Sequence, residues 1–170
     1  MNRFFQALIG TFLTEHLPEH TVASEHPLRG MISYVPGWNP RRQQAAIPRP
    51  DFVISHGQRI LAILDAKYRD LWEHSLTREM LYQLAIYALI GELGTATILY
   101  PTIHGQATEA RIALRDPHNG GHRAIIALRP VPLERLDDLI SARPTAALQR
   151  QRQAFARELA FGTGESRQGG

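Results

Sequence analysis

The chain has 170 residues, a net charge of +3 and no cysteine. This length suits one domain, and the lack of cysteine excludes disulfides, thiolate zinc sites, iron–sulfur clusters and cysteine nucleophiles. No segment approaches the roughly 20 apolar residues of a membrane span, and the apolar N-terminal run lacks a small-residue cleavage site, so we expect a cytoplasmic protein without a membrane segment. We expect a single domain over residues 1–162 and a disordered tail over residues 163–170.

Apolar periodicity and the positions of glycine and proline predict the helices and strands. In chain order, the expected elements are a helix over 3–16, a short strand over 29–35, strands over 51–55 and 60–68, a helix from Ser75 to Gly91 or Gly94, strands over 95–101, 109–116 and 122–130, a helix over 132–144 and a helical basic tail. The turn over 56–59 contains a glycine, so the strands that flank it should pair antiparallel. This order predicts an α/β fold with a mixed central sheet flanked by helices.

Lys67 is the only lysine, whereas the other strongly basic side chains are all arginine. Side chains alternate along a strand, so Lys67 and Asp65 point to the same face of the predicted sheet. Asp65 follows the apolar run ILAIL, and a buried carboxylate needs a partner charge or a metal. The predicted hairpin brings Asp51 to the same end of the sheet. Two carboxylates and a compact ammonium suit Mg²⁺ and phosphate chemistry, whereas the simpler interpretation is an ion pair on a sheet face.

These residues resemble the signature of the PD-(D/E)xK phosphodiesterases, because RPDFVI is followed after a short gap by ILDAKY. The resemblance implies a restriction-endonuclease-like fold in which Asp51, Asp65 and the backbone carbonyl of Ala66 bind Mg²⁺, for which Mn²⁺ would substitute. It also implies that Lys67 orients the attacking water and offsets charge in the transition state.

A second segment, YQLAIYAL, resembles the Q-x-x-x-Y helix of RecB-like nucleases. Gln83 and Tyr87 are four residues apart and therefore lie on one helical face. The resemblance implies that they position DNA or a loop near the metal. The alternative interpretation is a polar stripe on an otherwise buried helix.

From about residue 2 to about residue 101, the chain is similar to the C-terminal nuclease domain of McrC-like restriction subunits, whose first helix opens like MNRFFQALIGTFL. This similarity implies a Mg²⁺-dependent DNA endonuclease of a modification-dependent restriction system. It also implies a partner on a separate chain, an McrB-like AAA+ GTPase motor. Cutting both strands of DNA generally needs two active sites, so a homodimer or a partner-organised assembly is a further expectation.

One position departs from the McrC-like pattern. The first helix of that family usually carries a glutamate that contributes to the metal site, and in this chain Gln6 stands there. The carbonyl oxygen of Gln6 can still bind a cation but carries no charge, and Glu15 or Glu25 could substitute for it. The alternative function is therefore a weak or inactive nuclease-like fold that acts as a DNA-binding or assembly module. A toxin or transposon-associated nuclease is a third interpretation.

The loop before Asp51 contains one aromatic and two cationic side chains, Trp38, Arg41 and Arg42. If this loop lies near the entrance of the site, these residues could contact phosphates or stack on a base. A solvated loop with no role in binding is the alternative interpretation.

Overall fold

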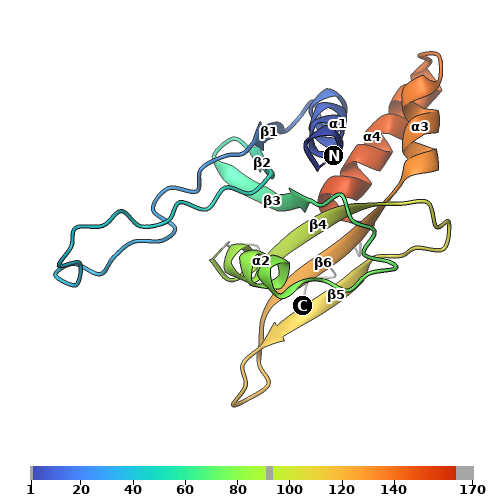
Figure 1. The fold of residues 1–170 in the computed structure, drawn as a ribbon. Helices are drawn as coiled ribbons and strands as arrows, with labels where there is room; N and C mark the ends of the chain where they lie inside the picture. Colours follow the sequence, from blue (N-terminus) through green and yellow to red (C-terminus); the bar gives the residue numbers. More distant parts are fainter. Residues whose placement is uncertain (1, 91–93, 164–170) are drawn as a thin grey trace, which may run out of the picture.

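The computed structural model describes residues 2–90 and 94–163 (Figure 1). In chain order, its elements are α1 (Asn2–His16), β1 (Thr21–Ser24), β2 (Phe52–His56), β3 (Arg59–Ala66), α2 (Arg78–Ile90), β4 (Thr95–Thr102), β5 (Ala110–Arg115), β6 (His122–Pro132), α3 (Leu133–Ser141) and α4 (Ala146–Phe161). The predicted mixed α/β fold is confirmed, and it is consistent with a restriction-endonuclease-like fold. Residues 164–170 of the expected tail, and Gly91 as a helix end, lie outside the described residues.

The six strands form one mixed sheet in the order β1-β2-β3-β4-β6-β5. The predicted hairpin is confirmed, because β2 and β3 pair antiparallel around the turn at Gly57, whose φ of +59° suits glycine. The central pairs β3–β4 and β4–β6 are parallel, whereas β1–β2 and β5–β6 are antiparallel. Parallel neighbours need a crossover, and α2 supplies it between β3 and β4.

Helices cover both faces of the sheet (Figure 1). On one face, α1, α3 and α4 pack in a core that includes Leu64 and Ala66 of β3. On the other face, α2 packs in a second core that includes Ile63 of β3 and Tyr87 of α2. Because side chains alternate along β3, Asp65 shares the face of Ile63 and lies on the α2 side of the sheet.

A long excursion separates β1 from β2, and we call its residues 26–50 the arm. Figure 1 shows the arm, in blue to cyan, projecting away from the sheet. Glu25 N–H donates to the carbonyl oxygen of Asp51 (2.9 Å) and so closes the root of the arm. Above the root, Leu28 packs partly against the core beneath α2, and its N–H donates to the Pro48 carbonyl (2.9 Å). Beyond this base, from residue 32 to residue 47, the side chains are exposed or half-buried.

Two predictions of local structure are wrong. The strand expected over 29–35 is absent from the described sheet, because this apolar segment lies in the arm and has no strand beside it. The helix expected from Ser75 begins at Arg78, because the hydroxyl and carbonyl oxygens of Thr77 accept N–H groups of the first turn. Within the described residues, no helix combines the length and apolar character that crossing a membrane requires.

Candidate active site

The β2–β3 hairpin places Asp51 beside the end of β3. Phe52, the first residue of β2, pairs with Leu64, so the residue before Phe52 lies next to the residues after Leu64. Asp51 Oδ2 accepts a hydrogen bond from the backbone N–H of Ala66 at 2.7 Å. The structure therefore brings the carboxyl groups of Asp51 and Asp65 to one end of the sheet, as the sequence predicts.

Lys67 is held at the same point by its backbone and its side chain. Its N–H donates to the carbonyl oxygen of Leu99 in β4 (2.9 Å), and its Nζ lies 2.6 Å from Asp65 Oδ2. Asp65 is only 1% exposed, whereas the Lys67 side chain is 19% exposed and reaches the surface. Apart from the lysine ion pair, Asp65 Oδ2 has no hydrogen-bond partner among the described residues. Asp65 is therefore a buried carboxylate with incomplete pairing.

The surroundings of these two carboxyl groups disfavour their charged forms. Burial, followed by the negative charge of Asp65, raises the pKa of Asp51 to about 6, although the Ala66 N–H and Lys67 act in the opposite direction. Burial also raises the pKa of Asp65, and the hydrogen bond and charge of Lys67 oppose this shift. Burial raises the pKa of both carboxyl groups, and the charge of Asp65 raises that of Asp51 further, so a cation would stabilise this site.

The side of the site that faces α2 contains Gln83 and Tyr87. Gln83 Nε2 donates to the Tyr87 hydroxyl oxygen at 3.1 Å, so the predicted pair is in contact. Tyr87 is 2% exposed, and burial raises its pKa, with further contributions from the charges of Asp65 and Asp51. The tyrosine hydroxyl is thus close enough to both carboxylates to feel their charge.

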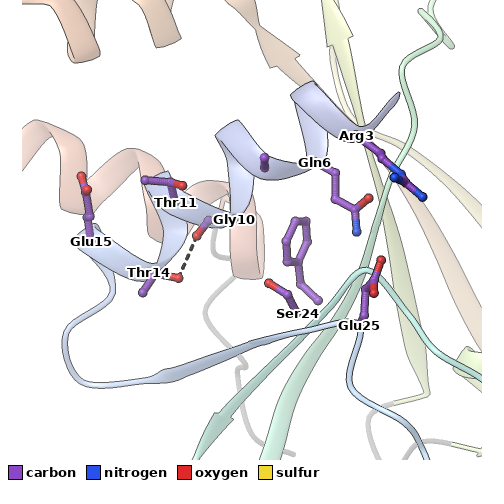
Figure 2. Close-up of a pocket in the computed structure, with 10 residues that line it drawn as sticks. Arg3, Gln6, Gly10, Thr11, Thr14, Glu15, Ser24 and Glu25 are labelled. Carbon is purple, nitrogen blue, oxygen red and sulfur yellow. Dashed lines mark hydrogen bonds between the residues drawn. The ribbon is translucent and has the colours of Figure 1, made fainter. Parts of the chain in front are cut away.

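Gln6 lies in a groove of about 630 Å³ between α1 and the first strands. Figure 2 shows Arg3 and Gln6 facing Glu25 at one end of the groove, whereas Glu15 lies at the other end of α1. Among the described residues, no hydrogen bond or ion pair joins Gln6 to Asp51. The link between the groove and the carboxyl pair is Glu25, whose charge contributes to the raised pKa of Asp51.

Glu25 is the residue whose place in the site the sequence indicates least clearly. It adopts φ +49°, a left-handed conformation that is uncommon for residues other than glycine. Its N–H hydrogen bond to Asp51 holds this backbone next to the carboxyl pair. Of the two glutamates that could substitute for the missing first-helix carboxylate, Glu25 is the one whose charge reaches Asp51.

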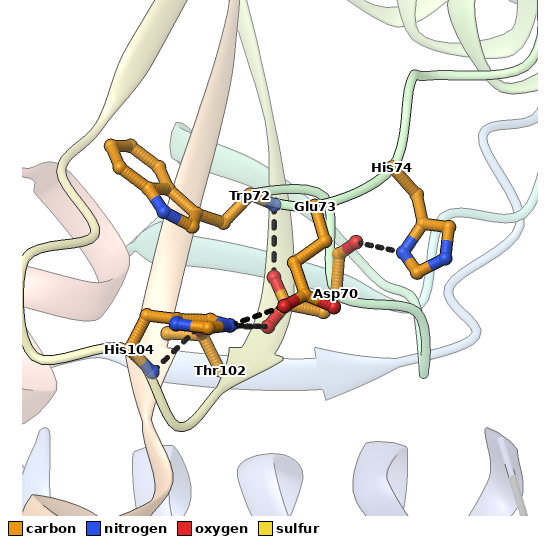
Figure 3. A network of polar contacts seen from close by, with 6 residues as sticks. All are labelled: Asp70, Trp72, Glu73, His74, Thr102 and His104. Atoms are coloured by element: carbon orange, nitrogen blue, oxygen red, sulfur yellow. Dashed lines mark hydrogen bonds and ion pairs between the residues drawn. The ribbon is translucent and has the colours of Figure 1, made fainter.

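The segment after Lys67 is attached to the end of β4 by a polar network (Figure 3). Thr102 Oγ1 donates to Asp70 Oδ2 (2.8 Å), while Asp70 Oδ1 accepts the N–H of Trp72 (2.9 Å). His104 Nε2 lies 2.7 Å from Glu73 Oε1 and ties a second residue of the segment to the same place. This network fixes the path of the chain as it leaves Lys67.

The aromatic and cationic residues that the sequence places before Asp51 lie in the arm. Trp38, Arg41 and Arg42 belong to the arm, which projects away from the sheet in Figure 1. The sequence shows that they precede Asp51 but does not show that the intervening residues form an extended excursion. The arm begins and ends at the site, and a role of these residues in contacting DNA stays a prediction.

The donor atoms available for a metal are oxygens. In residues 2–90 and 94–163, no group of three or more His, Asp or Glu side chains is arranged to share a metal ion. A cation here would rely on Asp51, Asp65, the Ala66 carbonyl and water. Mg²⁺ commonly binds through one or two carboxylates and keeps several waters, so this donor set fits it.

Comparisons with models of protein families and with curated proteins give no match. The fold is similar to a chain of a solved assembly described as a half-complex of Thermococcus gammatolerans McrB AAA+ hexamers with bound McrC. The similarity has a TM-score of 0.53 at 22% sequence identity and covers 91% of this chain. This chain spans only 33% of the length of that one. At this identity, the likeness is one of fold.

Proposed function

We propose that this protein is a Mg²⁺-dependent DNA endonuclease of the PD-(D/E)xK type. The observation that carries the proposal is the convergence of Asp51, Asp65 and Lys67 at the end of β3. Structural ion pairs also occur on sheets, but a purely structural pair does not need a second, repelling carboxylate beside it. The raised pKa of Asp51 shows that this arrangement destabilises its charged form, which supports a functional role for the two carboxyl groups.

Asp51, Asp65 and the Ala66 carbonyl would hold the Mg²⁺ ion, which Mn²⁺ would replace. When bound, the metal polarises a phosphate and lowers the pKa of a coordinated water. The β2–β3 pairing and the hydrogen bond from Ala66 N–H orient the Asp51 carboxyl group before any ligand arrives. Such preorganisation means that little of the protein must rearrange during the reaction.

Lys67 would act on the reacting groups directly. Its ammonium is anchored by Asp65 and remains partly exposed, so it can donate a hydrogen bond to a water or to a phosphate oxygen. In hydrolysis, the water oxygen bonds to phosphorus, the bond to the leaving sugar oxygen breaks, and that oxygen takes up a proton. The positive charge of Lys67 would stabilise the negative charge that develops on phosphate. Tyr87 and Gln83 would position the groups on the α2 side of the site.

A partner of the McrB kind is part of the proposal. It is supported by the McrC-like sequence pattern and by the fold similarity to a chain of an McrB–McrC assembly. We propose that this chain supplies the nuclease of a restriction system whose AAA+ motor is a separate chain. A homodimer would provide two active sites for the two DNA strands.

The test is cleavage of supercoiled plasmid by the wild-type chain with Mg²⁺, Mn²⁺ or EDTA, with and without an McrB-type motor and GTP. We expect nicking with either metal and none with EDTA. Lys67→Ala and Asp65→Asn should each lower the rate by roughly 100-fold or more, because the first removes the cation that stabilises charge on the phosphate and the second removes a carboxylate that would hold the metal. Arg69→Ala, which removes an exposed cation two residues away, is the matched control and should cut normally.

Metal binding provides a second measurement that does not depend on a motor. Calorimetric titration with Mn²⁺ should show binding to the wild-type chain and much weaker binding to Asp65→Asn. Nicking that survives unchanged in both Lys67→Ala and Asp65→Asn would show that another site, or another protein in the sample, cuts the DNA.

One observation favours a second candidate function, a nuclease-like module that binds DNA or organises an assembly without cutting. Gln6 replaces an expected carboxylate, and the described residues include no three-carboxylate cluster. A chain that binds DNA but neither Mn²⁺ nor Mg²⁺, and does not nick plasmid even with the motor, would support this alternative.

A further inference from the structure

The arm carries an excess of positive charge. Residues 26–50 contain four arginines, at positions 29, 41, 42 and 49, and neither aspartate nor glutamate. The whole chain has 19 Lys and Arg against 16 Asp and Glu, so with the four arm arginines set aside 15 remain against the same 16. The rest of the chain is therefore close to neutral in sum, although its C-terminal helical segment is also basic.

The arm displays these charges together with aromatic side chains. All four of its arginines are exposed. Trp38 is 79% exposed, and Tyr34 and Val35 are exposed as well. Large apolar side chains that gather in water on one segment indicate a binding surface.

Hydrogen bonds give the distal part of the arm a defined shape. The Asn39 side chain donates to the Gln43 carbonyl oxygen (2.8 Å) and accepts the Gln43 N–H (2.9 Å), which closes a turn around Arg41 and Arg42. The Tyr34 hydroxyl donates to Gln43 Oε1 (3.2 Å) and links the two sides of the arm. The cations are thus held on a formed turn, which lowers the entropy lost when a ligand binds.

We propose that the arm is a DNA-binding element in which Arg41 and Arg42 contact backbone phosphates and Trp38 packs against the nucleic acid. A guanidinium matches the geometry of phosphate with two parallel hydrogen bonds, and a tryptophan ring stacks on bases without regard to sequence. The inference rests on the proposed function for its substrate, but binding can be measured without cleavage.

The root of the arm connects this surface to the candidate active site. Glu25 N–H and the Asp51 carbonyl form the last hydrogen bond before the arm, and Asp51 is also the first carboxylate of the site. Because the arm begins and ends beside Asp51, DNA that runs from the distal turn along the arm would reach the candidate active site. A surface placed elsewhere on the protein would not have this continuity.

Charge distinguishes DNA from a protein as the partner. Protein interfaces are commonly rich in tryptophan and arginine too, but they rarely need four cations with no anion among them. A phosphate backbone presents one negative charge per nucleotide, and arginines that neutralise it release counterions. The arm is therefore complementary to a polyanion along its whole length.

The test is binding of a fluorescent duplex of about 30 base pairs in EDTA, measured by anisotropy between 50 and 200 mM salt. The double variant Arg41→Ala/Arg42→Ala should weaken binding roughly tenfold or more at low salt and reduce the slope of log Kd against log salt by about 2. The matched control is Arg143→Ala/Arg150→Ala, which removes the same charge from exposed positions near α3 and α4. We expect the control to bind within twofold of the wild type.

Equal weakening by the two double variants would show that binding depends on net charge alone and would overturn the inference. A wild-type dimer that is lost in Trp38→Ala, with DNA affinity unchanged, would assign the arm to a second copy of the chain and would also overturn it. Thermal unfolding of each variant checks that the fold is retained.

Tryptophan fluorescence tests the distal turn separately. The chain has two tryptophans, so Trp72→Phe leaves Trp38 as the single reporter. Saturation with DNA should change the Trp38 emission with the Kd measured by anisotropy. Unchanged emission would exclude the distal turn from the interface.

The outcomes separate this inference from the proposed nuclease activity. A chain that binds DNA through the arm but neither cuts it nor binds metal would retain the inference and refute the nuclease. If the wild-type chain cuts DNA and the Arg41→Ala/Arg42→Ala variant binds DNA as tightly as the wild type, the nuclease proposal is retained and the inference about the arm is refuted.

Discussion

Asp51 is the residue at which folding and the proposed chemistry make opposite demands. Its carboxyl group accepts the Ala66 N–H, which favours the charged form, but burial and Asp65 disfavour that form more strongly. Folding alone would be better served by a neutral side chain. A position of this kind is common where a protein gives up stability for function.

Asp51→Asn should therefore stabilise the metal-free protein above pH 6. The pKa of Asp51 is raised to about 6 from an ordinary value of 3.8, so between these values the folded state binds more protons than the unfolded state. Wild-type stability from this group is present below pH 3.8 and is lost as the pH rises through 6. Asparagine keeps an oxygen for the Ala66 N–H, so we expect a gain of about 1–3 kcal/mol at pH 8 in EDTA and a much smaller gain at pH 4.5.

Urea denaturation at both pH values measures this difference. Saturating Mg²⁺ should then stabilise the wild type and leave Asp51→Asn almost unchanged, because a ligand stabilises only the state that binds it. Equal destabilisation of the variant at both pH values would mean that the Asp51 charge is compensated in the folded protein.

Gln6→Glu tests whether the groove on α1 belongs to the proposed metal site. The new carboxylate would lie at the end of the groove that Glu25 and Arg3 share, close to the charge that reaches Asp51. We expect Mg²⁺ affinity in calorimetric titration to rise several-fold if position 6 supplies a ligand. Thr11→Glu adds the same charge farther along the groove and should have little effect. Equal affinities for wild type and Gln6→Glu would exclude position 6 from the site.

At the scale of elements, the site depends on how β3 and β4 hold the segment between Lys67 and α2. Thr102, at the end of β4, is 2% exposed and uses its hydroxyl group twice, as a donor to Asp70 and as an acceptor from the His104 N–H (3.1 Å). A buried polar contact of this kind is costly to break, because the groups that remain lose their partner.

Thr102→Val should lower the free energy of unfolding by about 1–3 kcal/mol, because valine has a similar shape but leaves Asp70 Oδ2 without its hydroxyl donor and the His104 N–H without its acceptor. Chemical denaturation measures the loss. In a double-mutant cycle, Thr102→Val combined with Asp70→Ala should cost clearly less than the sum of the two single changes. Simple additivity would indicate that the two side chains do not stabilise one another.

The elements that the sequence predicts well are those with a strong internal pattern. The apolar stripe of α1 and the hairpin of β2 and β3 can be read without knowledge of the fold, and so can the polar pair on α2. β1 cannot, because TVAS is a four-residue edge strand whose half-exposed positions show no alternation. The apolar residues 31–35 look like a strand, but a strand requires a neighbour, and only the tertiary structure shows that they have none.

The candidate site shows the same limit. Asp51, Asp65 and Lys67 can be found from the sequence because two short strings and a turn bring them together. The sequence leaves Glu15 and Glu25 open as substitutes for Gln6 and cannot choose between them, because the approach of Glu25 depends on a left-handed residue and on the hydrogen bond that closes a long excursion. The role of Gln6 depends in turn on where Glu25 lies.

At the scale of the whole molecule, the arm contributes little to the folding stability of the body. The buried side chains lie in the two cores on either side of the sheet, and the arm contributes to them only through its base. The exposed side chains over 32–47 bury little apolar surface, so they add little to the hydrophobic stabilisation of the fold.

A variant in which residues 33–46 are replaced by two glycines should retain its stability. We expect the free energy of unfolding to change by less than about 1 kcal/mol, because the removed side chains are largely exposed and a shorter loop costs less entropy to close. Urea denaturation with circular dichroism measures this change. A loss of several kcal/mol would show that the distal arm packs on the body in solution.

The pairing of Ser24 with Phe52 has a consequence for how such a protein can diversify. Ser24 is the last residue of β1 and Phe52 is the first residue of β2, so the excursion leaves and rejoins the sheet at one pair of neighbouring residues. Whatever is attached at that junction can change in length and chemistry without disturbing the Asp51–Asp65 carboxyl pair a few residues away. The junction is thus a natural grafting point, at which new binding preferences can be acquired while the sheet and the carboxyl pair stay the same.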